Sequence, residues 1–317
     1  MIDRRIILGI DTSNYTTSLA LLYDDGELIA NIKRPLTVKQ GERGLRQSDA
    51  VFSHIKNIPD AMQEVREKLN GRSPSAVGVS VRPRNKEGSY MPCFLSGVSA
   101  AESISATLGI PVFRFSHQCG HIMAALFSSG KRFSEGDTFG AFHISGGTTE
   151  LLLVKARKNG FDADIAGGTL DLNAGQLIDR VAVGLGLGFP GGPALEGLAL
   201  SYTGGVKGKK LALHDCYANL SGLENLAMDM YRKSGDSSEC AAFVFQSLAR
   251  GIFDMCSSFF DKYGNMPIVF AGGVMCNSII RSQIENQFEC YFAEPLLSAD
   301  NAVGIAELAR TSYLGTL

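Results

Sequence analysis

Two stretches of the chain read IILGIDTS (residues 6–13) and FGAFHISGG (residues 139–147). Each is an apolar run that ends in small polar residues, a pattern typical of a buried strand followed by a loop. A second apolar run and a turn dipeptide follow each stretch, Asp25-Gly26 after the first and Asn159-Gly160 after the second. Such dipeptides between apolar runs predict β-hairpins. Each half of the chain therefore begins with a strand, a polar loop and a hairpin.

The two stretches are spaced like parts of a repeated unit. Asp11 and Ser145 are 134 residues apart, and the turn glycines Gly26 and Gly160 are also 134 residues apart. A strand, loop and hairpin repeated at constant spacing predict two similar α/β domains that face each other. The loops at the strand ends would then line the cleft between the domains. The alternative is a chance similarity between two common hairpins.

The length of the chain fits this division. At 317 residues, of which 45% are hydrophobic, the chain is long enough for two domains with separate cores. We place the first domain at residues 1–115 and the second at residues 116–317. The final helix, predicted at about residues 300–314, is expected to pack back on the first domain.

Composition disfavours several classes of protein. The net charge of −2 provides no overall positive field for nucleic acid, so an RNA contact would depend on a local patch or a partner. The seven cysteines are scattered, as expected of reduced thiols in the cytoplasm. Residues 1–5 lack the pattern of a signal peptide, and the longest uncharged stretch, from Val181, is too rich in Gly and Pro for a membrane helix. We therefore expect a cytoplasmic protein that does not use a membrane.

A histidine pair follows a strand predicted at residues 110–115. His117 and His121 are four residues apart, so a helix that begins here would place them on one face, roughly 5–6 Å apart at Cβ. This is ligand spacing for a transition metal, whereas either histidine alone is more often a packed or surface residue. Gln118 stands where a His-Glu-x-x-His metalloprotease has its general base. Because an amide cannot take up the proton, that class of protease is disfavoured.

Two glycine-rich loops follow predicted strands. Ser145-Gly146-Gly147 ends the second quoted stretch, and Gly272-Gly273 follows the apolar run at residues 268–270. Glycines at a strand end let backbone N–H groups approach a phosphate or a ribose, although a Gly-Gly pair also serves as a plain tight turn. Two such loops in a repeated frame favour a nucleotide site.

Two acidic residues have alternative roles. Asp179 lies beside Arg180 in an apolar, helix-like run, where it would bond a ribose or simply pair with Arg180. Asp300 precedes an alanine-rich helix, where it would cap the helix or complete a metal site with the histidine pair. The residues alone leave these alternatives open.

Two clusters of basic residues are flanked by Gly or Pro, so we expect both on exposed loops. They are Arg82, Arg84 and Lys86 in the first half, and Lys207, Lys209 and Lys210 in the second. Such clusters either contact RNA phosphates or form an ordinary solvated surface. The first cluster follows a strand that should end beside the cleft.

In chain order, these motifs resemble the family of tRNA N6-adenosine threonylcarbamoyltransferases, formerly called O-sialoglycoprotein endopeptidases. The motifs are GIDTS at residues 9–13, the histidine pair, Ser145-Gly146-Gly147, Asp179, Pro190-Gly191-Gly192, Gly272-Gly273 with Asn277, and Asp300-Asn301. The resemblance covers about residues 5–312. It implies two duplicated actin-like ATPase domains (ASKHA, ribonuclease H-like) with an interdomain cleft, a cytoplasmic location and one metal ion.

The resemblance also implies a role for each residue. His117, His121 and Asp300 would hold iron or zinc, and Asp11 would be the catalytic residue, in the first phosphate loop near the transferring group. The adenylate half of threonylcarbamoyl-AMP would contact Ser145, Gly146, Gly147, Asp179, Gly192, Gly272, Gly273 and Asn277. In the family, adenine N6 of the tRNA attacks the carbamoyl carbon and AMP leaves. The implied partners are tRNA, a smaller actin-like paralogue and an ATPase.

The chain departs from the family pattern in loops near the implied substrate. Tyr15 and Thr16 replace an acidic pair, Thr148 replaces a histidine, Glu224 replaces a lysine, and residues 82–87 replace a Gly-Pro-Gly loop. Two functions therefore stay open, a transferase acting on tRNA and a non-catalytic paralogue that binds nucleotide and metal as a scaffold. A small-molecule kinase of the same superfamily is disfavoured, because it needs no metal-ligating histidines.

Overall fold

The computed structural model describes residues 4–37, 45–298 and 300–315. The chain divides into two compact units, which we describe separately. Unit 1 comprises Met1–Gly136, Ala156–Asp162 and Leu296–Leu317, and unit 2 comprises Asp137–Lys155 and Ala163–Pro295. Residues 116–136 thus belong to unit 1, whereas the boundary drawn from the sequence assigns them to the second domain. The sequence-based domain boundaries stay a prediction.

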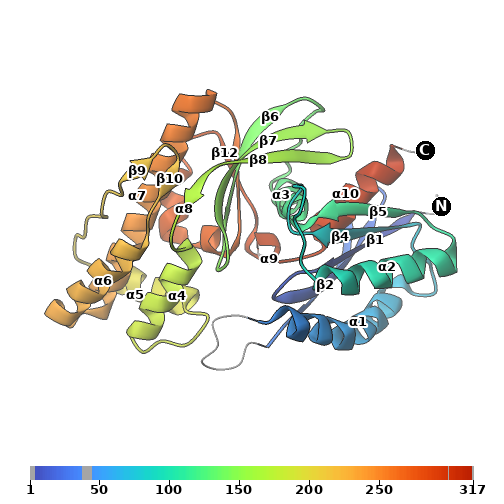
Figure 1. The fold of residues 1–317 in the computed structure, drawn as a ribbon, viewed down its shortest axis with the longest axis horizontal. Helices are drawn as coiled ribbons and strands as arrows, with labels where there is room; N and C mark the ends of the chain where they lie inside the picture. Colours follow the sequence, from blue (N-terminus) through green and yellow to red (C-terminus); the bar gives the residue numbers. More distant parts are fainter. Residues whose placement is uncertain (1–3, 38–44, 299, 316–317) are drawn as a thin grey trace. The chain divides into compact units, whose positions relative to one another are not determined.

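Unit 1 contains a five-stranded sheet in the order β3-β2-β1-β4-β5 (Figure 1). The strands are β1 (Ile6–Thr12), β2 (Thr16–Tyr23), β3 (Leu28–Pro35), β4 (Ala76–Arg82) and β5 (Val112–Ser116). β1, β2 and β3 pair antiparallel, as the Asp25-Gly26 turn predicts, whereas β4 pairs in parallel with both β1 and β5. The parallel strands are joined by helices, because parallel neighbours need a crossover connection.

Helices cover both faces of the sheet in unit 1. α1 (Gln47–Leu69) and α2 (Phe94–Leu108) pack on one face, and α3 (His117–Ser129) and α10 (Val303–Leu314) lie on the other. Side chains alternate along a strand, so Ile6, Leu8 and Ile10 of β1 join the core under α1 and α2. Gly9 faces α10 instead, and Asp11, two residues further, faces the same way.

α10 approaches the sheet and α3 so closely that only glycine fits at the contacts. A Cβ on Gly9 would lie 2.6 Å from the carbonyl oxygen of Ala302. A Cβ on Gly304 of α10 would overlap the carbonyl oxygen of Gly120 in α3. The two helices therefore cross backbone against backbone, which sets the separation between them.

A buried ion pair also ties α10 to the hairpin of β2 and β3. Arg310 Nε donates to Glu307 Oε2 at 2.6 Å, and both side chains are less than one tenth exposed. Arg310 Nη1 donates to the carbonyl oxygen of Asp24 at 2.8 Å. The hydrogen bond with Glu307 raises the pKa of Arg310, so the guanidinium keeps its charge although it is buried.

Unit 2 is built around a seven-stranded sheet in the order β12-β11-β6-β7-β8-β10-β9. The strands are β6 (Thr138–Ile144), β7 (Thr149–Arg157), β8 (Gly160–Thr169), β9 (Leu213–His214), β10 (Tyr217–Ala218), β11 (Ile268–Ala271) and β12 (Cys290–Phe292). The order β8-β7-β6-β11-β12 repeats the order β3-β2-β1-β4-β5 of unit 1, and β11 is parallel to β6 as β4 is to β1. The predicted duplicated α/β fold is confirmed.

The helices of unit 2 pack around one long, largely buried helix. They are α4 (Ala174–Gly184), α5 (Gly192–Ser201), α6 (Ser221–Ser234), α7 (Ser237–Tyr263), α8 (Ser278–Ile284) and the short 3₁₀ helix η1 (Gly273–Cys276), and α9 (Pro295–Ser298) leads on to α10. α7 contacts α5, α6 and α8 and buries Phe245 and Phe259 completely. Its apolar residues pack with those of the sheet and of the other helices in the core of this unit.

Some points concern single segments of the chain. α1 remains helical through Pro59. The prediction about a signal peptide involves residues 1–3, which lie outside the described residues. Within the described part of the chain, no helix combines the length and apolar character needed to cross a membrane.

Replacing Gly304 with alanine should lower the free energy of unfolding by about 1–3 kcal/mol, because the new methyl group forces α10 away from α3. The matched control is Gly197→Ala in α5, where a Cβ would meet no atom within 4 Å. That change should raise the free energy of unfolding by about 0.5–1 kcal/mol, since alanine loses less conformational entropy in a helix. Denaturant titration measures both values. Stabilisation by both substitutions would contradict the close crossing of α3 and α10.

Candidate functional site

The histidine pair lies at the start of α3. Ser116 caps this helix, and its Oγ accepts a hydrogen bond from the backbone N of Cys119 at 3.2 Å. The helix therefore begins at His117, and both histidines fall on one face, as their spacing predicts. Nε2 of His121 lies 3.0 Å from Nε2 of His117.

Asp300 completes a cluster with the two histidines in unit 1. Its Oδ1 lies 3.2 Å from Nε2 of His121 and 3.7 Å from Nε2 of His117. Ligand atoms held about 2.1 Å from a common ion are expected to lie roughly 3.0–3.5 Å from one another. The separations of 3.0 and 3.2 Å lie within this range and the 3.7 Å separation slightly exceeds it, so a small shift of one side chain brings two imidazole nitrogens and one carboxylate oxygen around a single ion. Among the described residues, this is the one group of three or more such side chains that converges in this way.

Neighbouring side chains orient the ligands. Oδ2 of Asp11 lies 2.9 Å from Nδ1 of His117, which directs Nε2 of the ring toward the other ligand atoms. Ser80 Oγ donates to Oδ1 of Asp11, and Ser13 Oγ donates to Oδ2 of Asp300. A carboxylate on the outer nitrogen of a metal-binding histidine fixes the tautomer and makes the ligand more basic. The cluster therefore has the surroundings that a metal-binding histidine requires.

The pKa shifts follow from these contacts. Burial by itself lowers the pKa of His117, but the carboxylates of Asp11 and Asp300 outweigh it and raise the pKa to about 9. Burial raises the pKa of Asp300, but the hydrogen bond with His121 and the charge of His117 hold it well below its usual range. An ion binding here must displace the imidazole proton, because a ligating histidine is neutral.

The loop that carries Ser13 is held in place by a buried histidine of α1. Nε2 of His54 lies 2.8 Å from the carbonyl oxygen of Ser13, and Nδ1 lies 2.8 Å from Thr17 Oγ1. Burial lowers the pKa of His54, so the ring is neutral and bonds at both nitrogens. Sequence reasoning missed the roles of His54 and Ser80, because no spacing links either residue to the ligands.

In unit 2, the two glycine loops begin at the ends of neighbouring parallel strands. Ala271 of β11 lies opposite His143 of β6, so both loops leave the same edge of the sheet. The first loop is closed by a hydrogen bond from Ser145 N to the carbonyl oxygen of Thr148 at 2.7 Å. Asn173, the residue before α4, donates from Nδ2 to the carbonyl oxygen of Gly147 at 2.9 Å.

The glycines of these loops differ in whether the fold itself leaves room for a side chain. Gly272 has a φ of +96°, and a Cβ there would overlap the carbonyl oxygen of Ile144, so the backbone itself demands glycine. A Cβ on Gly146, Gly147 or Gly273 would meet no atom of the protein within 4 Å. The backbone at these three positions is therefore open to a ligand.

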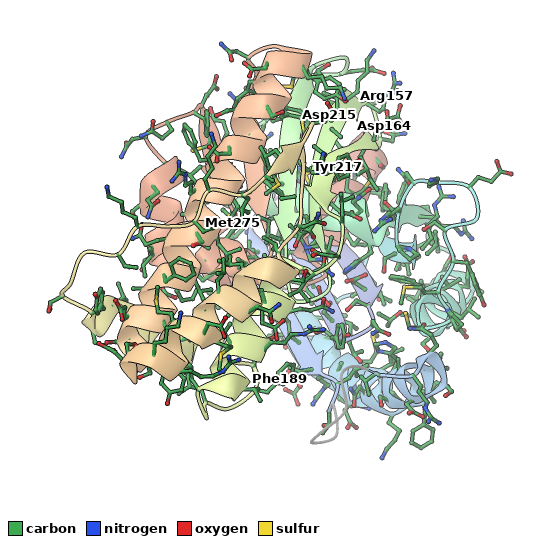
Figure 2. The ribbon with its side chains drawn as sticks, turned by 60° about the vertical axis from the view of Figure 1, so that its left-hand side comes forward. Arg157, Asp164, Phe189, Asp215, Tyr217 and Met275 are labelled. Carbon is green, nitrogen blue, oxygen red and sulfur yellow. The ribbon has the colours of Figure 1, made fainter. Side chains whose placement is uncertain are left out.

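Asp179 bonds the turn that precedes α5. Its Oδ1 accepts a hydrogen bond from Gly191 N at 2.8 Å, and burial raises the pKa of the carboxyl group. Arg180 instead pairs with Glu224 at 3.1 Å, which removes the Asp179–Arg180 pairing that the sequence left open. Phe189 of this turn is 66% exposed and lies beyond the end of α4 (Figure 2).

Asn277 is the residue before α8 and caps it, and Gly192 begins α5. The Oδ1 atom of Asn277 accepts a hydrogen bond from Ile280 N at 3.0 Å. Glu196 of α5 accepts hydrogen bonds from Ser278 N at 2.7 Å and from Ser278 Oγ at 2.6 Å. The contact of Glu196 joins α5 to α8 and was not predicted, since neither residue belongs to a recognisable motif.

The predicted site residues thus fall into two groups. His117, His121, Asp300 and Asp11 lie together in unit 1. The predicted nucleotide-binding residues belong to unit 2, where Asp179 lies within α4 and the others lie in the glycine loops or at helix starts.

Two α/β units with the same strand order define an actin-like ATPase fold, and solved structures agree. HypF in its phosphate- and nucleotide-bound form matches with a TM-score of 0.60 at 14% identity, over 97% of this chain and 46% of that one. The chain thus spans about half the length of HypF. Component A of (R)-2-hydroxyglutaryl-CoA dehydratase from Acidaminococcus fermentans matches with a TM-score of 0.56 at 18% identity, over 98% and 99% of the two chains. At these identities the likeness shows the fold alone.

Sequence comparison identifies the family. The family described as TsaD, tRNA N6-adenosine threonylcarbamoyltransferase, matches residues 27–307. The tRNA N6-adenosine threonylcarbamoyltransferase of Sulfurihydrogenibium sp. (strain YO3AOP1) is 28% identical, over 97% of this chain and 90% of the relative. The chain therefore belongs to the TsaD family. Membership supports a transferase that takes part in tRNA threonylcarbamoyladenosine modification.

Replacing His121 with alanine should remove most of the bound metal, because His117 and Asp300 alone leave only two protein ligands. The control is His214→Ala, which removes an exposed histidine of β9 and should leave the metal content unchanged. Elemental analysis of the purified proteins measures the ratio of metal to protein. A wild-type ratio in the His121 variant would refute the assignment.

Proposed function

We propose that this chain transfers the threonylcarbamoyl group from threonylcarbamoyl-AMP to N6 of an adenosine next to the tRNA anticodon. The observation that carries the proposal is the convergence of His117, His121 and Asp300, with Asp11 on the outer nitrogen of His117. In this reaction N6 attacks the carbamoyl carbon, and a C–N bond forms. The bond from that carbon to the phosphate oxygen breaks, AMP leaves with the electron pair, and N6 loses one proton.

The ligand set fits a resident iron or zinc ion. When bound, such an ion would supply a Lewis acid for the charge that develops on the mixed anhydride. Asp11 would position His117, because its side chain is 1% exposed and is bonded to both Ser80 and His117. Ser13 positions Asp300 in the same way.

The loops of unit 2 support binding of the adenylate half. The open backbone at Gly147 and Gly273 would donate N–H groups to phosphate oxygens. Asp179 uses one carboxylate oxygen for Gly191, and the second would accept a ribose hydroxyl. Asn277 uses Oδ1 for its helix cap, which leaves the Nδ2 group to donate to the nucleotide.

A non-catalytic scaffold is the second candidate, and three substitutions favour it. Tyr15, which is 41% exposed, and Thr16 leave the first loop without the acidic pair of the family pattern. Thr16 starts β2 and pairs with Pro35 of β3, so it takes part in strand pairing. Thr148 replaces the family's histidine and contributes its carbonyl oxygen to the loop turn. The complete metal-ligand cluster argues for the enzyme, since a scaffold has no need of a Lewis acid.

The wild-type chain should convert a tRNA transcript to threonylcarbamoyladenosine when supplied with threonylcarbamoyl-AMP and metal, with the product measured by mass spectrometry of digested RNA. Asp11→Asn should lower metal affinity by about 10–100-fold, because the outer partner of His117 is weakened. Excess metal should then restore part of the activity, as expected of a positioning residue. Asp164→Asn, which changes an exposed residue of β8 (Figure 2), is the control. A wild type that binds metal and nucleotide but forms no product would favour the scaffold.

Replacing Gly273 with valine should lower the affinity for AMP by tenfold or more, because the side chain occupies space that no protein atom fills. Gly205→Val is the matched control, since a Cβ there is equally unobstructed and lies outside both glycine loops. Calorimetry with AMP measures both, and circular dichroism checks the fold. Gly272→Ala is unsuitable, because its positive φ and its contact with Ile144 would disturb the fold. Equal affinities of wild type and Gly273→Val would exclude the loop from the nucleotide site.

A further inference from the structure

We propose that the loop of residues 82–90 in unit 1, here called the basic loop, binds backbone phosphates of the RNA substrate close to the adenosine that is modified. The inference rests on the proposed function, because it takes RNA as the substrate. It adds a specific contact surface that the ligand cluster itself does not provide.

The basic loop concentrates positive charge in a chain whose net charge is −2. Arg82, Arg84 and Lys86 lie within five residues, and Glu87 is the single acidic residue of the loop. Arg82 and Lys86 are exposed. The local excess of positive charge would attract a polyanion such as an RNA strand, whereas the net negative charge of the whole chain would not.

The basic loop is joined to the helix that carries the histidines. Gln118 N, one residue after His117, donates to the carbonyl oxygen of Pro83 at 2.9 Å. Asn85 Nδ2 lies 3.3 Å from Sγ of Cys119, the next residue along α3. These bonds tie the loop to the first turn of α3, where the ligand cluster begins.

A second connection runs through β4. Arg82 is the last residue of this strand, and Ser80, two residues earlier, donates to Asp11. Asp11 in turn contacts His117. The basic loop therefore leaves the sheet directly beside the ligand cluster, so an RNA strand bound there would pass close to the metal site.

The backbone of the basic loop is internally bonded, which reduces the entropy lost on binding. Arg84 N donates to Ser89 Oγ at 3.0 Å, and Ser89 N donates to the carbonyl oxygen of Lys86 at 3.1 Å. Asn85 also donates to the carbonyl oxygen of Phe161 at 3.0 Å. The cationic side chains are thus presented from an ordered turn.

An aromatic residue ends the basic loop. Tyr90 is 62% exposed and follows Lys86, the last of the cations, by four residues in the chain. Cationic side chains next to an exposed aromatic ring are typical of surfaces that bind single-stranded nucleic acid, where bases stack on the ring. An adenosine next to the anticodon lies in a single-stranded loop, so both kinds of contact are available to it.

The second basic cluster of the chain, Lys207, Lys209 and Lys210, lacks these connections. It lies in unit 2, where Lys209 N donates to Ser247 Oγ, and none of the contacts described for it involves the ligand residues. It therefore provides a control with the same change of charge.

The experiment measures binding of an unmodified tRNA transcript to the full chain by filter binding over a series of salt concentrations. Arg82→Glu/Lys86→Glu should weaken binding about 25–60-fold at about 0.1 M salt and should flatten the salt slope by roughly 1.4–1.8, as expected for two lost phosphate contacts. Tyr90→Ala should weaken binding about tenfold without changing the slope, because stacking releases no counterions. Lys207→Glu/Lys209→Glu should leave affinity and slope close to wild type. Affinity for AMP should be unchanged in all variants.

Two results would overturn the proposal. One is wild-type affinity and slope in Arg82→Glu/Lys86→Glu, and the other is an equal loss in Lys207→Glu/Lys209→Glu, which would make overall charge the cause. A failure of the proposed function is recognised separately. In that case the wild type binds the transcript with the expected salt slope but forms no threonylcarbamoyladenosine.

Discussion

The backbone contact between α3 and α10 is the constraint on which the metal-ligand cluster depends. α3 begins with His117, and Asp300 lies just before α10, so the distance between the helices sets the distance between the ligands. Gly120 and Gly304 allow the helices to touch, and any larger residue at position 304 would separate them. Gly9 allows α10 the same close approach to the sheet. The chemistry of the site therefore rests on residues that carry no functional group.

The duplicated topology places different chemistry at equivalent positions of the two units. The end of β1 supplies Asp11 and the loop after it supplies Ser13, and the oxygen atoms of both side chains orient metal ligands. The loop after β6 supplies Gly146 and Gly147, whose backbone is open to a ligand. In both units the loop leaves a central strand that pairs with a hairpin on one side and a parallel strand on the other. The same architecture thus supports a site built from side chains in unit 1 and a loop in unit 2 that offers its backbone to a ligand.

Local patterns in the sequence predicted much of this arrangement. The two hairpins and the shared face of His117 and His121 follow from short-range periodicity, and the structure has both. The long-range contacts were not predictable in this way, because the contacts of Ser80 and His54 join segments far apart in the chain. The residues alone left the role of Asp300 open between a helix cap and a metal ligand, and family resemblance favoured the ligand, since no spacing rule relates Asp300 to His121, 179 residues earlier. Residue spacing describes helices and turns, whereas the partners of a buried polar group are chosen by tertiary packing.

Unit 1 is assembled from segments at both ends of the chain, and this has a consequence for biosynthesis. Chains are made from the N-terminus, and domains tend to fold as their residues emerge from the ribosome. Both histidines are made early, yet Asp300 and α10 emerge only after the whole of unit 2 has been synthesised. Until then the sheet lacks the helix that covers Gly9, and the histidines lack their third ligand. A nascent chain therefore cannot hold metal in this cluster, and loading must follow the arrival of the last helix.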